Sequence, residues 1–148
     1  MGFDLTGNKA KSKKGEYFRN NVWWWRPLAE YVMLNCNVND FAEWGFNNGH
    51  LVEETEALDI ADKLDELIAS RETAKYAREY RAMLKKLPKE KCDLCNGTGV
   101  RNDKIVQGKC NGCVKGFRDN FAIHYPFSVE NVRNFSKFCR DSGGFTIG

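Results

Sequence analysis

The sequence predicts an α+β protein with a mostly helical domain, a helical hairpin, a small cysteine-rich ribbon insert and a C-terminal strand followed by a helix. Residues 53–87 hold two amphipathic stretches of helical period, residues 91–118 hold two cysteine pairs, and residues 121–141 hold an alternating segment before a capped helix. We expect three regions. An aromatic and basic arm with the helical region spans 1–90, the ribbon spans 91–118, and residues 119–148 pack back on the helical region.

The first fifty residues give the weakest secondary-structure signal. Residues 1–20 are rich in Gly and Lys and are interpreted as a loop or arm. Pro27 suits the first turn of a helix, which we expect to run to about Cys36. Residues 37–50 are rich in Asn, Gly and Phe and are interpreted as a loop.

Two amphipathic helices are expected next, over residues 53–69 and 73–87, and Pro88 ends the second. Because they are consecutive and amphipathic, an antiparallel hairpin is the expected arrangement. The acidic side of the first would then face the basic side of the second. The apolar positions are Ala57, Ile60, Ala61, Leu64, Leu67 and Ile68 in the first helix and Tyr76, Tyr80, Met83, Leu84 and Leu87 in the second.

The C-terminal region predicts a strand at 121–125, stopped by Pro126, and then a helix at 129–141 with Ser128 as its N-cap. Its apolar face would hold Val132, Phe135, Phe138 and Cys139. The glycines at 143 and 144 end this helix, and residues 145–147 can form a short closing strand.

Composition indicates a cytoplasmic protein. The chain has 148 residues, of which 42% are hydrophobic and 29% charged, and it contains no apolar run of about 18 residues that could span a membrane. The lysines near the start are not followed by an apolar segment, so a secretory signal is not expected.

The net charge of +3 is unevenly distributed. Residues 1–27 carry six basic and two acidic side chains. Residues 53–68 carry one basic and seven acidic side chains, and residues 71–91 carry eight basic and three acidic side chains. Blocks of this kind steer charged partners, and solvated helix faces produce the same pattern.

Four cysteines form two C-x-x-C pairs, Cys92 with Cys95 and Cys110 with Cys113, separated by fourteen residues. This spacing is close to the zinc-ribbon pattern. Each pair can direct two thiolates at one ion, and glycines after the pair allow the positive φ angles that such turns need. Four thiolates leave no position for an activated water, so we expect one structural Zn²⁺.

Three other uses of these cysteines remain open. Disulfide bonds would suit an exported protein. One pair alone could form a thioredoxin-like redox site, although two matched pairs argue against it. Four thiolates can also hold an iron–sulfur cluster.

The segment Cys92-x-x-Cys95-x-Gly97-x-Gly99 resembles the C-x-x-C-x-G-x-G repeat of the DnaJ cysteine-rich domain. That family carries four repeats and two zinc ions, so two repeats here imply one zinc. The second repeat departs from the pattern, since Lys115 and Phe117 flank Gly116 where glycines would stand. The chain lacks the His-Pro-Asp tripeptide of a J-domain, so the resemblance does not imply co-chaperone activity.

The flanks resemble a set of small uncharacterised bacterial and bacteriophage proteins that also hold a DnaJ-like zinc motif late in the chain. Residues 15–27, 125–132 and 142–147 carry this resemblance. It implies a bacterial cytoplasm, or a host cytoplasm for a phage-encoded protein. It implies no activity.

An aromatic and basic cluster near residues 17–26 is a candidate partner-binding surface. Three consecutive tryptophans cannot all face one core, so at least one is expected at the surface or at an interface. In the alternative interpretation, two anchor the core and one packs under a loop. The candidate residues are Tyr17, Arg19, Trp23, Trp24, Trp25 and Arg26.

A basic helix face could instead follow a phosphate backbone, or could simply be solvated. Its candidate nucleic-acid contacts are Arg71, Lys75, Arg78 and Lys85. His50 and His124, the two histidines, lie in no recognised catalytic motif. Cys139 is expected to be buried, and Cys36 has no neighbour in sequence that would lower its pKa.

Three functional hypotheses follow. The first is a non-enzymatic zinc-stabilised interaction protein that binds another protein, such as a phage-encoded modulator or inhibitor of a host protein. The second is a nucleic-acid-binding zinc protein that uses the basic helix and exposed tryptophans. The third is a small enzyme with a site assembled around His50 or His124. No membrane partner is expected, and no residue is assigned a catalytic role.

Overall fold

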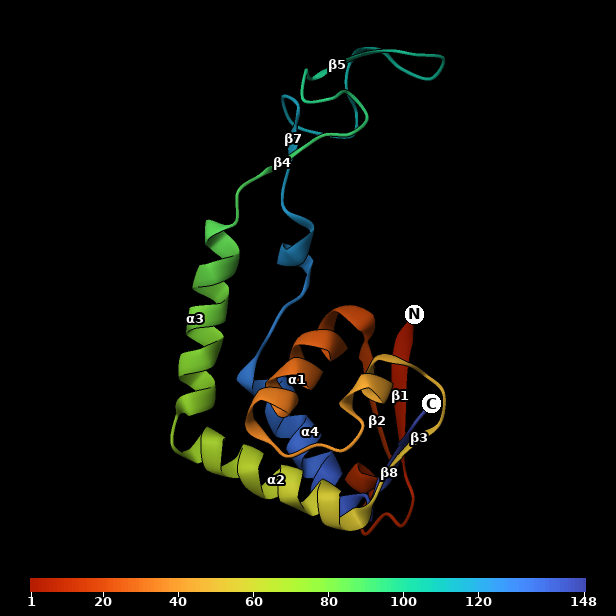
Figure 1. Cartoon of the computed structure of the whole chain (residues 1–148), viewed down its shortest axis with the longest axis vertical. Helices are drawn as coiled ribbons and strands as arrows, with labels where there is room; N and C mark the ends of the chain where they lie inside the picture. The colour runs from red at the N-terminus through yellow and green to blue at the C-terminus, as the bar shows by residue number, and fades with distance from the viewer. The chain divides into compact units, whose positions relative to one another are not determined.

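The structure, a computed structural model, describes residues 1–148 and divides into two compact units. The main unit comprises residues 1–81 and 125–148, and the ribbon unit comprises residues 82–124. Four α-helices accompany small antiparallel sheets, which confirms the α+β class (Figure 1). The ribbon unit extends beyond the residues 91–118 that the sequence suggested, at both ends.

The main unit contains a four-stranded antiparallel sheet with the strand order β2-β1-β8-β3. The strands are β1 (Gly2–Gly7), β2 (Tyr17–Asn21), β3 (His50–Val52) and β8 (Phe145–Ile147). The first and last strands pair at the centre of the sheet, with Leu5 opposite Ile147. The closing strand expected at residues 145–147 is therefore confirmed.

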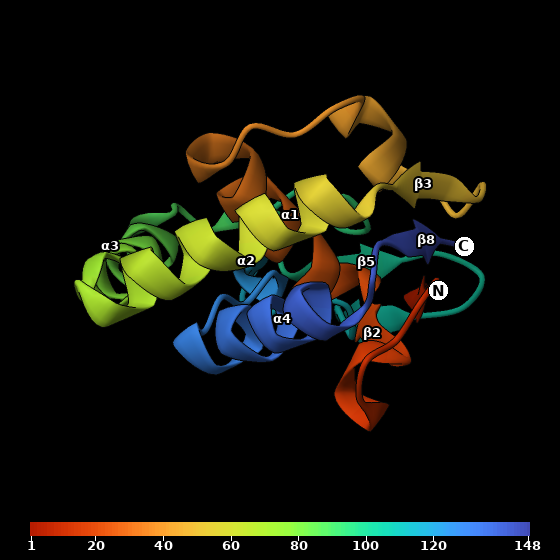
Figure 2. The same cartoon turned by 90° about the horizontal axis from the view of Figure 1, so that it is seen from below.

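The helices of the chain are α1 (Val22–Asn35), α2 (Glu54–Ala69), α3 (Glu72–Lys86) and α4 (Val129–Asp141). Helix α4 packs along α2, as Figure 2 shows. The core between the helices and the sheet is unusually aromatic. Its largest fully buried side chains are Trp25, Trp44, Tyr31, Phe3, Phe135, Phe138 and Phe145.

Polar contacts fix α4 on α2. Arg140 reaches Asp62 and Asp65 at 2.8 Å each, and the Ser136 hydroxyl donates to the Ala61 carbonyl oxygen at 3.2 Å. The Ser128 cap accepts a hydrogen bond from the backbone N–H of Asn131, as expected. The acidic side of α2 is thus paired with Arg140 of α4. The sequence had suggested that it would face the basic side of α3 instead.

Helices α2 and α3 are consecutive, as predicted, but they meet at a corner and do not lie along each other (Figure 1). Arg71 forms the corner in the left-handed region, with φ 66°. The apolar face of α3 instead contacts α1 and Phe127, since Tyr76 lies 4.6 Å from Tyr31 and 4.9 Å from Phe127 between ring centroids. This partner comes from distant sequence, so helical periodicity alone could not identify it.

The prediction of a loop over residues 1–20 was wrong, because this segment supplies β1 and β2. Phe3 and Leu5 are buried while their neighbours Asp4 and Thr6 are not, which is the alternation of a half-buried strand. The pattern is only four residues long and precedes a lysine-rich stretch, so composition concealed it.

Helix α1 begins five residues before Pro27, although the sequence predicted a start at that proline. The Asn21 side chain accepts a hydrogen bond from the Trp24 N–H at 3.1 Å and caps the helix. Pro27 lies inside the helix and is buried, so its packing offsets the backbone hydrogen bond that it cannot donate.

Two further segments differ from expectation. Residues 37–50 include a 3₁₀ helix, η2 (Phe41–Gly45), and the start of β3. The strand predicted at 121–125 was wrong, because Phe121–His124 form a 3₁₀ helix, η3. Asn120 explains this turn: its side chain accepts from the Ala122 N–H and its carbonyl accepts from the Ile123 N–H.

Candidate metal centre

The ribbon unit brings the two cysteine pairs together through two small antiparallel pairings. Strands β4 (Glu90–Lys91) and β7 (Phe117–Arg118) pair at its base, and β5 (Val100–Asn102) pairs with β6 (Gln107–Lys109) as a hairpin between the cysteine pairs. Backbone bonds complete the frame. Cys92 N–H donates to the Gly116 carbonyl at 2.8 Å, and Cys110 N–H donates to the Gly99 carbonyl at 2.9 Å.

The four thiols converge on one point. The Sγ atoms of Cys92 and Cys110 lie 4.0 Å apart, those of Cys95 and Cys113 lie 3.6 Å apart, and all four lie within 4.8 Å of one another. No disulfide joins them, and three of the four residues are buried. This arrangement can hold a metal ion, as the spacing of the four cysteines predicted.

Glycines and left-handed residues shape both turns. Gly97 and Gly99 follow the first pair with φ 79° and 78°, and Gly116 follows the second with φ 93°. A Cβ at Gly116 would collide with the Gly97 carbonyl oxygen, so glycine is required there. Lys115, at the position where the C-x-x-C-x-G-x-G pattern has its first glycine, adopts φ 52°. The second turn thus takes its glycine one residue later, at Gly116.

The Cys95 thiol ionises more readily than an ordinary cysteine thiol. Burial opposes its ionisation, but hydrogen bonds from the Gly99 and Gly97 amides and from the neighbouring thiols outweigh burial and lower its pKa to about 6. The Gly99 N–H lies 3.2 Å from this sulfur. A thiolate here supplies the charged form that binds metals.

Apart from this cluster, the ribbon unit has almost no core. Its buried side chains are those of Cys92, Cys95 and Cys110, with Cys113 packed against them. Eight large apolar side chains of the unit remain at least one-third exposed: Met83, Leu94, Val100, Ile105, Val114, Phe117, Phe121 and Ile123. A metal at the four thiols would therefore be the main organising contact of this unit.

The candidate partner-binding residues at 17–26 are spread over several environments. Trp25 is 1% exposed and lies in the core, while Trp23 and Trp24 are partly buried. Arg19 pairs with Asp4 at 3.5 Å, and the exposed Tyr17 hydroxyl donates to the same carboxylate. Only part of the predicted cluster is therefore accessible.

The four candidate nucleic-acid contacts, Arg71, Lys75, Arg78 and Lys85, are all exposed. None of them lies within ion-pair distance of a carboxylate of the chain. Their charges are available to a partner.

The histidines and remaining cysteines form no cluster with the metal centre. His50 lies on β3 and its Nε2 is buried without a hydrogen-bond partner, while His124 lies on η3 with its ring 5.8 Å from Phe121. Burial raises the pKa of Cys36 to about 11 and raises that of the buried Cys139 thiol as well. Neither thiol is activated at neutral pH.

One feature that sequence reasoning missed is a cleft between α1 and η2, behind which Trp44 is fully buried. The signal was present as the aromatic run Phe41-Ala-Glu-Trp44-Gly-Phe46 within a stretch interpreted as loop. The Trp25 Nε1–H donates to the Trp44 carbonyl oxygen at 2.8 Å and ties this stretch to α1.

No helix of the structure is long and apolar enough to cross a membrane. Comparisons of the chain with models of known protein families, with curated proteins and with solved structures found no match.

Proposed function

We propose that Cys92, Cys95, Cys110 and Cys113 bind one structural Zn²⁺. A regular tetrahedron with Zn–S bonds of about 2.3 Å has sulfur–sulfur edges of about 3.8 Å. Two of the six sulfur–sulfur distances, 3.6 Å between Cys95 and Cys113 and 4.0 Å between Cys92 and Cys110, bracket this value, and all six are at most 4.8 Å. With four sulfur ligands the ion keeps no open position for water, so its role would be to stabilise the ribbon unit. Such thiolates persist in a reducing compartment such as a bacterial cytoplasm.

We further propose that the chain is a non-enzymatic interaction protein whose zinc-bound ribbon binds another protein. The observation that carries this proposal is the exposure of apolar side chains on a unit whose only core is the thiol cluster. Ile105 is 84% exposed at the tip of the β5–β6 hairpin, and Val114 is 70% exposed beside the second cysteine pair. Apolar groups held in water by a rigid frame favour a protein interface.

The hairpin tip is ordered before any partner arrives. The Asp103 carboxylate accepts hydrogen bonds from the Ile105 and Val106 N–H groups at 2.8 Å each, and Arg101 pairs with the same side chain at 2.6 Å. Binding through Ile105 would then cost little backbone entropy. The resemblance to phage proteins suggests a modulator or inhibitor of a host protein as the biological setting.

The test is affinity purification of the tagged chain from a bacterial host, beside an Ile105→Ser, Val114→Ser variant. Both side chains are exposed, so this variant should fold and keep its metal. We expect a stoichiometric protein partner that is lost in the variant and also lost after chelation. A partner retained by the variant would exclude Ile105 and Val114 as its binding surface, and a partner retained after chelation would exclude the folded ribbon.

A nucleic-acid-binding function is the second candidate, favoured by the exposed and unpaired cations of α3. The ribbon unit also carries nine Lys and Arg residues against four Asp and Glu, a balance of +5 before any thiolate is counted. This hypothesis predicts affinity that falls steeply with salt. An Arg78→Glu, Lys85→Glu variant should then lose the affinity, and an unchanged affinity would exclude this surface.

A further inference from the structure

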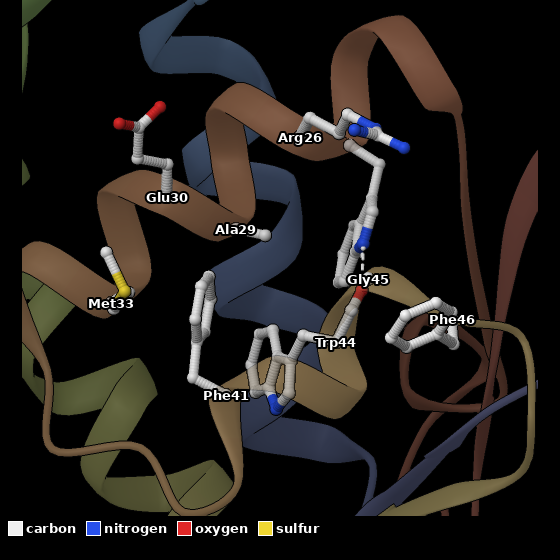
Figure 3. A pocket seen from close by; sticks show the side chains of 9 residues that line it. Arg26, Ala29, Glu30, Met33, Phe41, Trp44, Gly45 and Phe46 are labelled. Carbon is white, nitrogen blue, oxygen red and sulfur yellow. Dashed lines mark hydrogen bonds between the residues drawn. The ribbon is translucent and has the colours of Figure 1, made fainter.

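One cleft of the main unit has the size of a binding pocket. It is the cleft between α1 and η2, which encloses about 520 Å³ and is drawn in Figure 3. This volume lies within the range of about 300–1,000 Å³ that is typical of binding pockets. Its walls are largely aromatic, and Met33 and Phe41 stand on the opposite side of the view from Arg26 and Phe46.

We propose that this cleft binds a peptide segment of a partner protein in which a bulky apolar side chain lies beside a carboxylate. The apolar side chain would occupy the hollow above Trp44, and the carboxylate would pair with Arg26. Since the cleft lies wholly in the main unit, this inference goes beyond the role proposed for the ribbon.

The floor of the cleft is rigid. Trp44 is fully buried and stacks on Trp25, with ring centroids 5.7 Å apart and planes 15° from parallel. The Trp25 indole N–H also holds the Trp44 carbonyl oxygen at 2.8 Å (Figure 3). The two buried indoles therefore support the accessible lining of the cleft from behind, with the Phe41 ring 6.3 Å from that of Trp44, and a preformed lining favours binding.

The rim supplies apolar area that is still in contact with water. Phe46 is 61% exposed and Met33 is 41% exposed. A bulky apolar side chain held next to Arg26 would cover part of this area at the Phe46 end of the cleft, and this burial is the main source of affinity that the site offers.

Gly45 keeps the hollow open. A Cβ placed on this residue meets no atom within 4 Å, so the space above it is empty. Its φ does not lie in the left-handed region, and a side chain can be introduced there without backbone strain. Because Gly45 lines the cleft, a bulky side chain introduced there would reduce the space left for a ligand.

The charge at the rim selects an anion. Arg26 is exposed, and no carboxylate of the chain lies within ion-pair distance of its guanidinium. Glu30 also lines the cleft, but its carboxylate points away from Phe41 and Trp44 (Figure 3). A peptide with a carboxylate next to its apolar anchor would fit this arrangement, whereas one with an ammonium there would be repelled.

The experiment titrates the full zinc-bound chain with capped tripeptides that contain phenylalanine after aspartate, asparagine or lysine. Amide and indole resonances of the protein report where each peptide binds. We expect shifts at Gly45, Phe46 and the Trp25 indole N–H, with the aspartate peptide binding about threefold more tightly than the asparagine peptide. Replacing phenylalanine by alanine in the peptide should abolish binding.

Three variants complete the test. Gly45→Leu should block the cleft, Arg26→Glu should remove the preference for aspartate, and Lys13→Glu, a matched charge change away from the cleft, should do neither. The proposal would be overturned if no resonance of the cleft shifts at millimolar peptide, or if the lysine peptide binds best. Shifts of the same resonances on concentrating the protein alone would assign the cleft to self-association and overturn it as well.

Discussion

At the scale of single residues, the four ribbon cysteines differ from the other two in environment. The four lie within 4.8 Å of one another, and backbone amides face at least one of their sulfurs. Cys36 and Cys139 pack against the main core, where burial raises their pKa values. Chain spacing was sufficient to predict this division, because a C-x-x-C turn places both thiols on one side of a short loop.

We expect Cys110→Ser to lower zinc affinity by at least about 100-fold, since it removes one ligand from the coordination sphere. Competition with a chromophoric chelator measures this change. Cys36→Ser is the matched control and should keep the affinity of the unaltered chain. Equal affinities in the two variants would exclude Cys110 as a ligand.

The three adjacent tryptophans should respond very differently to removal. Trp25 is 1% exposed and donates a hydrogen bond to the Trp44 carbonyl, so Trp25→Ala should destabilise the main unit by about 3–5 kcal/mol. Trp24 is partly exposed, and Trp24→Ala should cost clearly less. Urea unfolding of both variants tests the assignment, which fails if Trp24→Ala is the more damaging change.

Which tryptophan is buried could not be predicted from the sequence. The answer depends on where α1 begins, and Asn21 sets that start by accepting a hydrogen bond from the Trp24 amide. Asparagine caps many turns as well as helices, so its presence alone does not fix the phase of the helix.

At the scale of elements, α3 is held by its tyrosines. The Tyr80 hydroxyl donates to the Tyr125 carbonyl oxygen at 2.6 Å, and the Tyr31 and Thr73 hydroxyls lie 2.9 Å apart. Burial, together with the nearby Tyr76 and Glu30, raises the pKa of Tyr80 from 10.0 to about 12. The neutral phenol is thus the form that the fold stabilises.

This shift predicts an alkaline loss of stability. Because the pKa of Tyr80 is higher in the folded state, the neutral Tyr80 side chain contributes fully to the free energy of unfolding below pH 10. This contribution disappears as the pH rises toward 12. Tyr80→Phe should be less stable near neutral pH by about 0.5–1.5 kcal/mol. Urea unfolding as a function of pH should then show a smaller alkaline decrease for Tyr80→Phe than for the unaltered chain. Parallel curves would contradict the account.

The elements that the sequence predicted well are those whose signals are long and local. Helices α2, α3 and α4 have apolar faces of three or more turns, and α4 adds the Ser128 cap. Strands β1 and β2 were missed because their alternation covers only a few residues. The corner at Arg71 was missed because the surface that receives α3 is built by α1 and Phe127 from elsewhere in the chain.

At the scale of the whole molecule, the two units have different origins of stability. The main unit buries a continuous apolar core that joins all four strands of its sheet to the helices. The ribbon unit buries little besides its thiols. Sequence spacing predicted that the four cysteines of the insert could hold a metal ion, but it could not show that the insert has so little other core or that its apolar side chains stay exposed.

Removal of the metal should therefore unfold one unit only. A strong chelator under reducing conditions should collapse the amide dispersion of residues 90–118 and leave that of β1, β8 and α4 unchanged. Two-dimensional NMR measures both regions in one sample. Uniform loss of dispersion in both units would show that the main unit also depends on the ion.

The most direct test of the central claim, one zinc on four thiolates, is native mass spectrometry of the chain purified under reducing conditions without added metal. We predict a single species whose mass exceeds that of the reduced chain by one zinc ion, with the four ribbon thiols protected from alkylation. A metal-free chain with disulfides, or a mass that fits an iron–sulfur cluster, would contradict it.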